Sequence, residues 1–289
     1  MITGKTIVIT GASRGIGKAI ATKMASMGNN LVIAAKTTTT HSKLEGTIHE
    51  TVEECKNLGS NAIAVKLDVR EKEDINNVVQ QARSEFGGID ILINNASAVS
   101  NSSTDKLKLN KFNLMNEVNY KGTFLMTQAC LPDLLKSSSP HVLNMSPPLD
   151  LNPEWFELGG TAYTISKYNM SMCALGMSQE FKNKIAFNCL WPKTLIATAA
   201  VNMLAGSVGM KASRKPDIMA DAATWILSQD KSVSGNFFID EEVITNEIGD
   251  NDLNKYSNTI LPIPLMQDLY VGNPDNVRKL LQMSKLMTK

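Results

Sequence analysis

The chain has 289 residues, of which 43% are hydrophobic, and its formal net charge is +1 at pH 7. This length and apolar content allow a substantial core, as one large domain or two small ones. The near-zero charge and the lack of a basic cluster exclude the usual signature of a nucleic-acid-binding protein, and no apolar run approaches the roughly 18 residues of a membrane span.

Cysteine and histidine usage gives no sign of disulfides or a metal. The Cys residues stand at 55, 130, 173 and 189 with no close pair, which indicates buried thiols in a reducing compartment. The His residues, at 41, 49 and 141, do not cluster with Cys or acids at ligand spacing, so no metal site is expected. The opening stretch MITGKTIVIT lacks a signal-peptide pattern and the final LMTK is not a peroxisomal address. We therefore expect a soluble, cytoplasmic protein without a membrane span.

In the first part of the chain, short β-branched runs alternate with amphipathic segments. Strands are expected at 6–10, 30–35, 61–69 and 89–96, and helices at 18–28, 49–58 and 73–86. Gly28, Gly59 and Gly87 stand at the ends of these helices, where glycine is a common C-cap. Residues 37–48 have little pattern and predict a loop.

The second part repeats this rhythm. Helices are expected at 107–136, 162–182 and 216–228, strands at 140–146, 185–191 and 235–240, a loop at 147–160 and an irregular segment at 193–215. Continuous apolar strands that alternate with helices predict an α/β fold, with a doubly wound (Rossmann-type), mostly parallel sheet and helices on both faces. Residues 1–240 then form a single catalytic domain with a substrate lid at about 193–215. Residues 241–289 fit the rhythm poorly and are expected to form a C-terminal appendage packed on that domain.

A glycine-rich stretch, TGASRGIG at 10–17, joins the first strand to the first helix. Gly11 permits a tight turn, while Gly15 and Gly17 let the backbone approach a pyrophosphate at the helix N-terminus. The spacing is G-x-x-x-G-x-G rather than G-x-G-x-x-G, so an ordinary glycine-rich turn is the alternative. The strand-loop-helix context favours the phosphate site.

Several motifs follow in one order along the chain: this loop, LDV at 67–69, NNA at 94–96, Asn119 in NEVNYKGTF, Ser146 and YTISK. Together they resemble the short-chain dehydrogenase/reductase family over residues 1 to about 240. The segments VIAAK, LNMSPPLDLNP and LWPKT are similar to one subgroup of that family. The resemblance implies an oxidoreductase that interconverts an alcohol and a carbonyl with NAD(P).

The end of the second strand favours NADP(H) over NAD(H). It reads Ala35-Lys36, and residues 31–40 hold no acid that would bind the ribose hydroxyls. Arg14 and Lys36 suit a 2′-phosphate, although both could be solvated surface charges. By the resemblance, Asp68 contacts adenine, or else simply caps a helix. The expected cofactor-binding residues are Gly11, Ser13, Arg14, Gly15, Ile16, Gly17, Lys36, Asp68, Val69, Asn95, Ala96, Tyr163, Lys167, Pro192 and Thr194.

The stretch TAYTISKYNM places Lys167 four residues after Tyr163, so the two share a helix face. A phenol with a pKa near 10 is a poor proton carrier at neutral pH, and both a neighbouring cation and a helix N-terminus favour its phenolate. The alternative is an aromatic core residue beside an unrelated charge.

The resemblance assigns roles to four residues. Tyr163 is the general acid/base, and Lys167 lowers the tyrosine pKa and binds the nicotinamide ribose. Ser146 holds the substrate oxygen, and Asn119 helps to position water behind the lysine. Ser146 could instead be an ordinary strand-end hydroxyl and Asn119 a backbone-bonding helix residue. Ser146 also stands 17 residues before Tyr163 (163 − 146), a few more than is usual in the family, and Pro147 holds it extended.

Two segments are expected to line the substrate cleft. The first contributes Leu149, Leu151, Trp155 and Phe156, and the second Leu195, Ile196, Val201, Met203, Leu204, Val208 and Met210. Adaptable apolar walls predict a lipid-like or terpenoid alcohol or carbonyl compound, unless these side chains only pack the lid or a subunit contact. Lys193 replaces a family glycine after Pro192, Ser97 replaces another, and either Thr194 or Thr198 could contact phosphate.

The resemblance also bears on partners. Close relatives can carry a sterol-carrier-like domain after the catalytic one, and we expect no such domain in this chain. A homodimer or homotetramer is expected through 107–136 and 162–182, whose faces include Met126, Met170, Met172 and Met177. The alternative function is a non-catalytic nucleotide-binding redox sensor or scaffold on the same fold.

Overall fold

The computed structural model describes residues 2–40, 45–259 and 263–279. His41, part of the predicted loop 37–48, and residues 260–262 and 280–289 of the predicted appendage lie outside these described ranges.

A parallel sheet forms the centre of the described chain. Its strands are β1 (Thr6–Thr10), β2 (Asn30–Ala35), β3 (Ala62–Lys66), β4 (Ile91–Asn94), β5 (His141–Asn144), β6 (Ala186–Trp191) and β7 (Phe237–Ile239). They pair in the order β3-β2-β1-β4-β5-β6-β7, every neighbour parallel. This confirms the predicted doubly wound sheet. The order reverses between β1 and β4, and such a switch point opens a crevice at the carboxyl ends of the strands.

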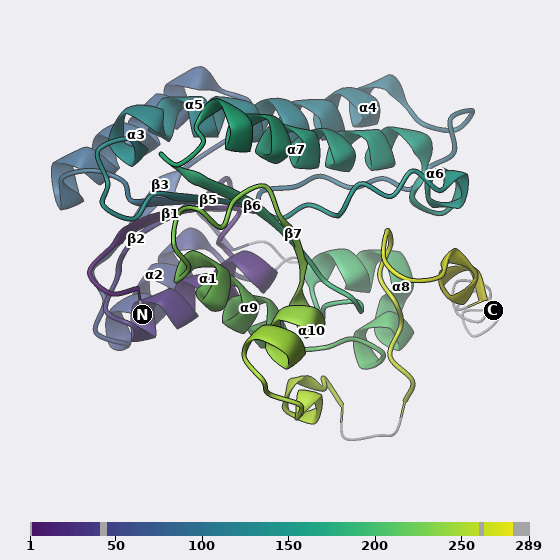
Figure 1. Cartoon of the computed structure of the whole chain (residues 1–289). Coiled ribbons are helices and arrows are strands. Elements are labelled where there is room, and N and C mark those ends of the chain that lie inside the picture. Colours follow the sequence, from purple (N-terminus) through teal and green to yellow (C-terminus); the bar gives the residue numbers. More distant parts are fainter. Residues whose placement is uncertain (1, 41–44, 260–262, 280–289) are drawn as a thin grey trace.

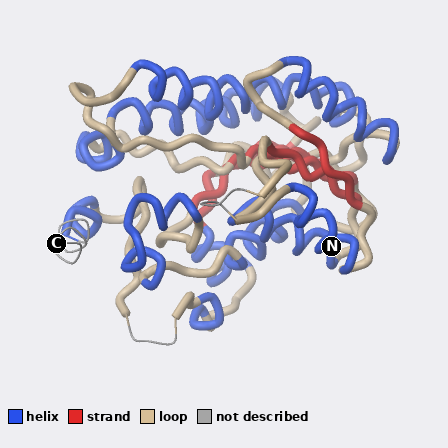
Figure 2. The backbone as a smooth tube through the Cα atoms, turned by 180° about the vertical axis from the view of Figure 1, so that it is seen from behind, coloured by secondary structure: helices blue, strands red, loops and turns tan. Residues whose placement is uncertain are grey.

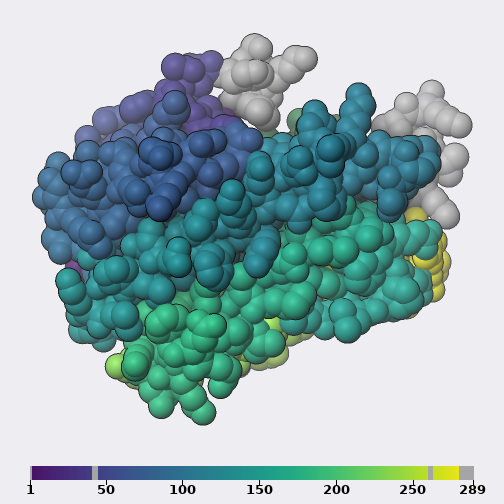
Figure 3. All heavy atoms as spheres, turned by 90° about the horizontal axis from the view of Figure 1, so that it is seen from above, coloured from purple at the N-terminus to yellow at the C-terminus, as the bar shows by residue number. Residues whose placement is uncertain are grey.

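Helices cover both faces of the sheet. On one face lie α1 (Gly15–Ser26), α2 (Ile48–Asn57) and α9 (Asp217–Leu227); on the other lie α3 (Lys72–Phe86), α5 (Gly122–Leu134) and α7 (Thr161–Glu180) (Figure 1). Successive side chains of a strand alternate between faces. Accordingly Ile7 and Ile9 join the core on the α1 side, while Val8 joins the core on the α3 side. Figure 2 shows the strands between the two layers, and Figure 3 shows the outer surface of the α7 layer.

Two segments differ from the prediction. The expected loop 147–160 contains α6 (Pro153–Gly159), because Asn152 caps the helix through Glu154 N and Pro153 occupies its first turn. The expected irregular segment 193–215 contains α8 (Ala199–Lys211), capped by the Thr198 side chain. Gly206, at φ 58°, interrupts the helical conformation of α8, so the apolar periodicity of a helix is not continuous there in the sequence. The expected helix 107–136 is α4 (Leu109–Met115), the π-helical η1 (Asn116–Lys121) and α5 in succession.

The C-terminal segment packs along the end of β6. It includes α10 (Asp240–Glu242), the π-helical η2 (Val243–Glu247), the 3-10 helix η3 (Leu253–Tyr256) and a helical stretch at 274–279. Tyr270 is buried, and its ring centroid lies 5.9 Å from that of Trp191 and 5.3 Å from that of Tyr168. No helix among the described residues has the length and apolar character needed to cross a bilayer.

Candidate active site

The glycine loop between β1 and α1 is packed against the end of β4. A Cβ added at Gly17 would lie 2.5 Å from Asn95 Nδ2, and one at Gly11 would lie 2.9 Å from Ala96 Cα. Asn95 Nδ2 donates hydrogen bonds to the carbonyls of Thr10 (2.9 Å) and Gly11 (3.0 Å). The NNA motif therefore holds the loop in a shape that side chains at Gly11 and Gly17 would prevent.

The N-terminus of α1 can receive an anion. Its first turn has no acidic residue and no side-chain cap, so its N–H groups stay available. Thr198 stands beside this turn, since a Cβ added at Gly15 would lie 3.2 Å from its Cγ2. The residues present fit the pyrophosphate of a dinucleotide.

The cations expected at the 2′-phosphate have protein partners. Arg14 donates from Nε to the Glu45 carbonyl (2.8 Å) and from Nη2 to the Gly46 carbonyl (2.7 Å). Lys36 Nζ lies 3.0 Å from Asp68 Oδ2, and Arg70 contacts the same oxygen at 2.6 Å. Arg70, then Lys36, hold the pKa of Asp68 well below its usual range. The Lys36 side chain is 60% exposed and remains able to reach a ligand.

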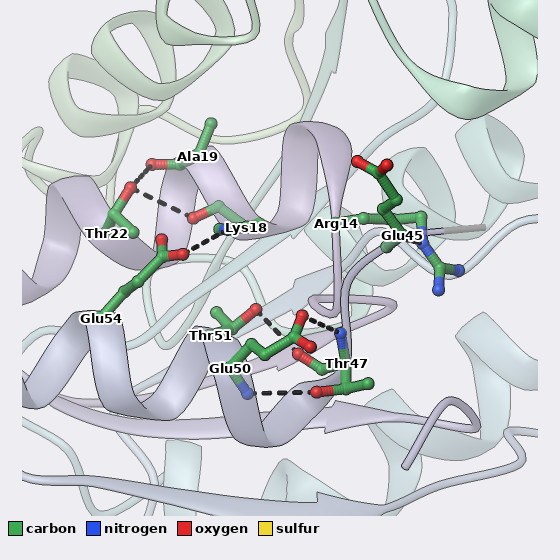
Figure 4. A network of polar contacts seen from close by, with 9 residues as sticks. All are labelled: Arg14, Lys18, Ala19, Thr22, Glu45, Thr47, Glu50, Thr51 and Glu54. Carbon is green, nitrogen blue, oxygen red and sulfur yellow. Dashed lines mark hydrogen bonds and ion pairs between the residues drawn. The ribbon is translucent and has the colours of Figure 1, made fainter. Parts of the chain in front are cut away.

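Figure 4 shows how the neighbouring helices support this region. Thr47 and Glu50 form a capping box at the start of α2, and the ion pair between Lys18 and Glu54 joins α2 to α1. Arg14 lies apart from that network, next to Glu45 (Figure 4).

A cavity of about 1090 Å³ runs from the glycine loop to the C-terminal segment. Most of the predicted cofactor residues line it: Gly11, Ser13, Arg14, Gly15, Ile16, Lys36, Asp68, Val69, Asn95, Ala96, Tyr163, Lys167 and Pro192. Four predicted site residues, Gly17, Asn119, Ser146 and Thr194, are not among the residues that line it. Thr198, rather than Thr194, is the threonine on the wall.

Tyr163 and Lys167 lie in the first two turns of α7, and both side chains are buried at the cavity wall. Lys167 Nζ donates to the Met145 carbonyl (2.6 Å) and lies 5.0 Å from the Trp191 ring centroid. Burial lowers the pKa of Lys167. Burial also raises the pKa of Tyr163, and Asp268 adds to that rise. These protein groups alone therefore favour the neutral phenol, not the phenolate that the sequence suggested.

Asn119 joins the loop after β4 to α7. Its Oδ1 accepts from Ala98 N (2.7 Å) and Ser97 Oγ (3.2 Å), and its Nδ2 donates to the Ala98 carbonyl and to Ser166 Oγ, each at 2.9 Å. Ser166 in turn donates to the Tyr163 carbonyl. The π-helical turn of η1 places this side chain, a device that recurs at functional sites.

Ser146 is not brought to the cavity. It follows β5 by two residues, its side chain is fully buried, and its Oγ has no hydrogen-bond partner among the described residues. The next residue, Pro147, is fixed by a hydrogen bond from Ser171 Oγ to its carbonyl (2.5 Å). The geometry therefore unites Tyr163 with Lys167 but leaves the predicted serine behind them.

The comparisons with known proteins agree with this geometry. A family model described as short chain dehydrogenase matches residues 5–207. The chain belongs to the short-chain dehydrogenase family. Hydroxysteroid dehydrogenase-like protein 2 of Danio rerio is 51% identical over 280 residues, which cover 96% of this chain and 66% of that relative's length. The subgroup indicated by VIAAK, LNMSPPLDLNP and LWPKT is thereby confirmed, and the chain spans slightly less than two thirds of this relative.

Solved structures give the same fold. A crystal structure of a Xanthomonas campestris protein is 43% identical, with a TM-score of 0.89, and covers 94% of this chain and 100% of its own. L-sorbose reductase from Gluconobacter frateurii, complexed with NADPH and L-sorbose, is 25% identical, with a TM-score of 0.71, and covers 82% of this chain and 95% of its own. The chain thus has the fold of the short-chain dehydrogenase family, and one neighbour with this fold binds NADPH.

Within this family member, the substrate end of the cavity differs in part from the prediction. Leu195, Ile196, Val201, Met203 and Leu204 line it as expected, whereas Val208 and Met210 do not. From the first predicted segment, Glu157 and Leu158 line it instead of Leu149, Leu151, Trp155 and Phe156. Trp155, in α6, is fully buried in the core, and Leu151, before that helix, is exposed.

The C-terminal segment supplies wall residues that the sequence analysis missed: Met266, Gln267, Asp268, Leu269, Val277 and Arg278. No spacing links them to Tyr163, which lies about a hundred residues earlier in the chain (268 − 163). The one usable signal was a lone acid within the mainly apolar stretch LPIPLMQDLY.

Proposed function

We propose that the chain is an NADP(H)-dependent oxidoreductase that interconverts an alcohol and a carbonyl on an apolar substrate, with Tyr163 as general acid/base. One observation carries this proposal. The glycine loop and the Tyr163–Lys167 pair line the same cavity, whose far end is walled by apolar side chains of α8 and the C-terminal segment. A dinucleotide at the loop and a substrate at the far end would meet at Tyr163.

Different residues of the chain have different roles in carbonyl reduction. The bound cofactor supplies the hydride, and in the reverse direction accepts it. Tyr163 gives its phenol proton to the substrate oxygen, and its neutral form is the one that can do so. Lys167, held by the Met145 carbonyl, supplies a positive charge that stabilises the phenolate left behind. Asn119 positions α7 against the loop after β4. Ser146 would hold the substrate oxygen only if its hydroxyl turned into the cavity.

Replacing the tyrosine hydroxyl tests the catalytic part of the proposal. Tyr163→Phe should lower NADPH turnover with aldehydes and ketones by about 10²–10⁴-fold, the usual contribution of a general acid, and leave NADPH binding unchanged. Tyr168→Phe is the matched control, because the Tyr168 hydroxyl donates to the Asp150 carbonyl and is not part of the cavity wall. Equal activity of Tyr163→Phe and wild type contradicts the role. Tight NADPH binding by a wild type that turns over no substrate supports the non-catalytic sensor or scaffold instead.

Lys36 is proposed to select NADP(H) through the 2′-phosphate. Its ammonium lies beside Asp68 on the cavity wall, while Arg14 is held by backbone carbonyls. Lys36→Ala should raise the Kd for NADPH about 10-fold, the loss of one charge-assisted pair, with the Kd for NADH unchanged. Lys66→Ala, an exposed lysine at the end of β3, should change neither. Tighter binding of NADH than NADPH by the wild type refutes the preference.

The apolar wall supports a lipid-like or terpenoid substrate. Met203 and Leu204 are largely exposed at the cavity, and the neighbouring Leu195 and Val201 continue the surface. A panel of aldehydes and ketones of increasing chain length should show KM falling as the apolar part grows. Turnover confined to small polar carbonyls excludes this substrate class.

A homodimer or homotetramer through α4, α5 and α7 is part of the proposal. The outer faces of these helices expose large apolar side chains, namely Leu109, Phe112, Phe124, Ile165, Met172 and Leu175. Of the four methionines named from the sequence, only Met172 is on this surface; Met126, Met170 and Met177 are buried in the core. Light scattering at a monomer mass would contradict the assembly.

The unpaired cysteines support a reducing, cytoplasmic setting.

A further inference from the structure

Asp268 is fixed on the cavity wall by the segment that follows β6. Residues 266–269 run antiparallel to 193–195, with a bridge between Thr194 and Gln267. Leu195 N donates to the Met266 carbonyl (2.8 Å), and Asp268 N donates to the Lys193 carbonyl (3.0 Å). Trp191 Nε1 completes the arrangement with a hydrogen bond to the Leu269 carbonyl (2.8 Å). A carboxyl group from the far end of the chain is thus held at the catalytic pair.

The fold uses only one oxygen of this carboxyl group. Asp268 Oδ1 accepts from Leu269 N (2.7 Å). Among the residues that the structure describes, Oδ2 has neither a hydrogen-bond partner nor an ion pair, and Lys167 donates to Met145 instead. The titratable groups that face Asp268 are Tyr163 and Lys167 of α7 and Tyr270 of its own segment. A carboxyl oxygen without a partner among the described residues therefore belongs to the same cavity wall as the phenol that handles the substrate proton.

Burial raises the pKa of Asp268 to about 7, although Leu269 N and Lys167 oppose the rise. A large fraction of the group then carries its proton at neutral pH and can donate a hydrogen bond. An acid kept neutral by its surroundings is an established kind of donor to a developing oxyanion.

Because Ser146 is not on the cavity wall, the substrate oxygen needs a hydrogen-bond donor other than Ser146. Reduction of a carbonyl places negative charge on its oxygen, and a second donor beside Tyr163 stabilises that charge. The serine expected in that role is buried behind the wall, whereas Asp268 is on it. We propose that protonated Asp268 is a catalytic residue that donates a hydrogen bond to the substrate oxygen, taking the place expected of Ser146.

The proposal rests on the carbonyl–alcohol chemistry proposed above. In the reduction, hydride adds to the carbonyl carbon, the C=O π pair moves to oxygen, and Tyr163 transfers its proton to that oxygen. Asp268 keeps its own proton throughout. Ionised Asp268 cannot donate, so reduction should slow as the pH rises through its pKa.

The experiment measures kcat and KM for NADPH-dependent reduction of an apolar aldehyde across the neutral pH range. Asp268→Leu removes the donor and should lower kcat about 10²-fold at every pH, with a smaller change in KM. Asp268→Asn keeps a donor that does not titrate. It should retain more activity than Asp268→Leu and show a weaker decline in rate near neutral pH, of which the part due to deprotonation of Lys167 remains.

Asp240→Asn is the matched control. Asp240 is also buried with its pKa raised to about 7, and it accepts a hydrogen bond from Lys193 N (2.8 Å), but it is not on the cavity wall. This variant should keep the wild-type decline. NADPH binding, followed by its fluorescence, shows whether each variant is folded.

The outcomes separate the two proposals. Wild-type kcat in a folded Asp268→Leu, or an unchanged decline in Asp268→Asn, overturns the role of Asp268 alone. A wild type that binds NADPH but reduces no carbonyl overturns the proposed function, and the role of Asp268 with it. If Asp268→Leu does not fold, the pH profile of Asp268→Asn decides.

Discussion

The two ends of the cavity are built in different ways. The nucleotide end is made by turns that directly follow strands, at residues 11–16, 35–37, 67–69 and 95–99. The substrate end is made by side chains from outside the sheet, at residues 157–158, 195–205, 266–269 and 277–278.

The two ends of the cavity should therefore differ in how well they tolerate amino-acid substitutions. At the nucleotide end, Gly11 and Gly17 approach neighbouring atoms so closely that almost any substitution displaces the loop. At the substrate end, α8 and the C-terminal segment can exchange side chains without disturbing the sheet. We therefore expect changes at the first end to abolish cofactor binding, and changes at the second to alter substrate selection.

The largest effect is expected from Gly17→Ala. The new methyl group would lie 2.5 Å from Asn95 Nδ2 and 2.7 Å from the Gly11 carbonyl oxygen. Because the loop must shift, NADPH affinity should fall at least about 100-fold, roughly 2.7 kcal/mol, measured by fluorescence titration.

Gly176→Ala is the control for Gly17→Ala. Gly176 is exposed inside α7 and has no atom within 4 Å of a new Cβ. Its replacement should stabilise the fold by about 0.5–1 kcal/mol and leave NADPH binding unchanged. Wild-type affinity in Gly17→Ala would remove the contrast between the two ends.

A smaller effect is expected from Arg278→Met at the substrate end. Arg278 contacts Glu154 and Glu157 of α6, each at 2.9 Å, and so joins the C-terminal helical stretch to the cavity wall. Loss of these pairs should raise the substrate KM several-fold, with the Kd for NADPH unchanged. Lys255→Met breaks a comparable exposed pair with Asp250, away from the cavity, and should leave KM as in the wild type. An equal effect of both variants on KM would contradict the assignment.

The sheet could be predicted from the sequence because its signals are local. Each strand is a short apolar run that ends near a glycine, proline or polar turn, and each expected strand is present with bounds within a few residues. The signals for α6 and α8 were weaker. Both begin after a capping side chain, at Asn152 and Thr198, but prolines precede the first helix and Gly206 interrupts the second.

The site could be predicted only in part, for a related reason. The Tyr163–Lys167 pair lies within one helix, and the glycine loop joins one strand to the next helix. Each motif is therefore recognisable from its spacing in the sequence. Asp268 is held at the same cavity by hydrogen bonds with Lys193 and Leu269. No periodic pattern in the sequence predicts these contacts. The direction of the Ser146 side chain likewise depends on how Pro147 is held by Ser171, a contact between distant residues.

A buried acid at the nucleotide end and one outside the cavity wall have different surroundings, and the pH dependence of stability should report this difference. Asp68 is paired with Lys36 and Arg70, whereas Asp240 has cations at neither oxygen: Oδ1 accepts from two backbone N–H groups and Oδ2 has no partner among the described residues. Burial raises the pKa of Asp240 from 3.8 to about 7. The folded state therefore holds a proton that the unfolded state releases in this range.

The last effect, on stability rather than on binding, follows from that proton. The contribution of Asp240 to the free energy of unfolding should fall as the pH rises from its ordinary pKa to about 7, by up to about 1.4 kcal/mol per pH unit for one proton. Asp240→Asn removes this contribution, so urea denaturation at several pH values should show a shallower dependence. Asp68→Asn should leave the slope between about pH 5 and 7 as in the wild type, because Asp68 is ionised in both states there. An unchanged slope in Asp240→Asn would mean that its carboxyl group is already ionised in the folded protein, and that two backbone N–H donors are enough to hold a buried carboxylate without a cation.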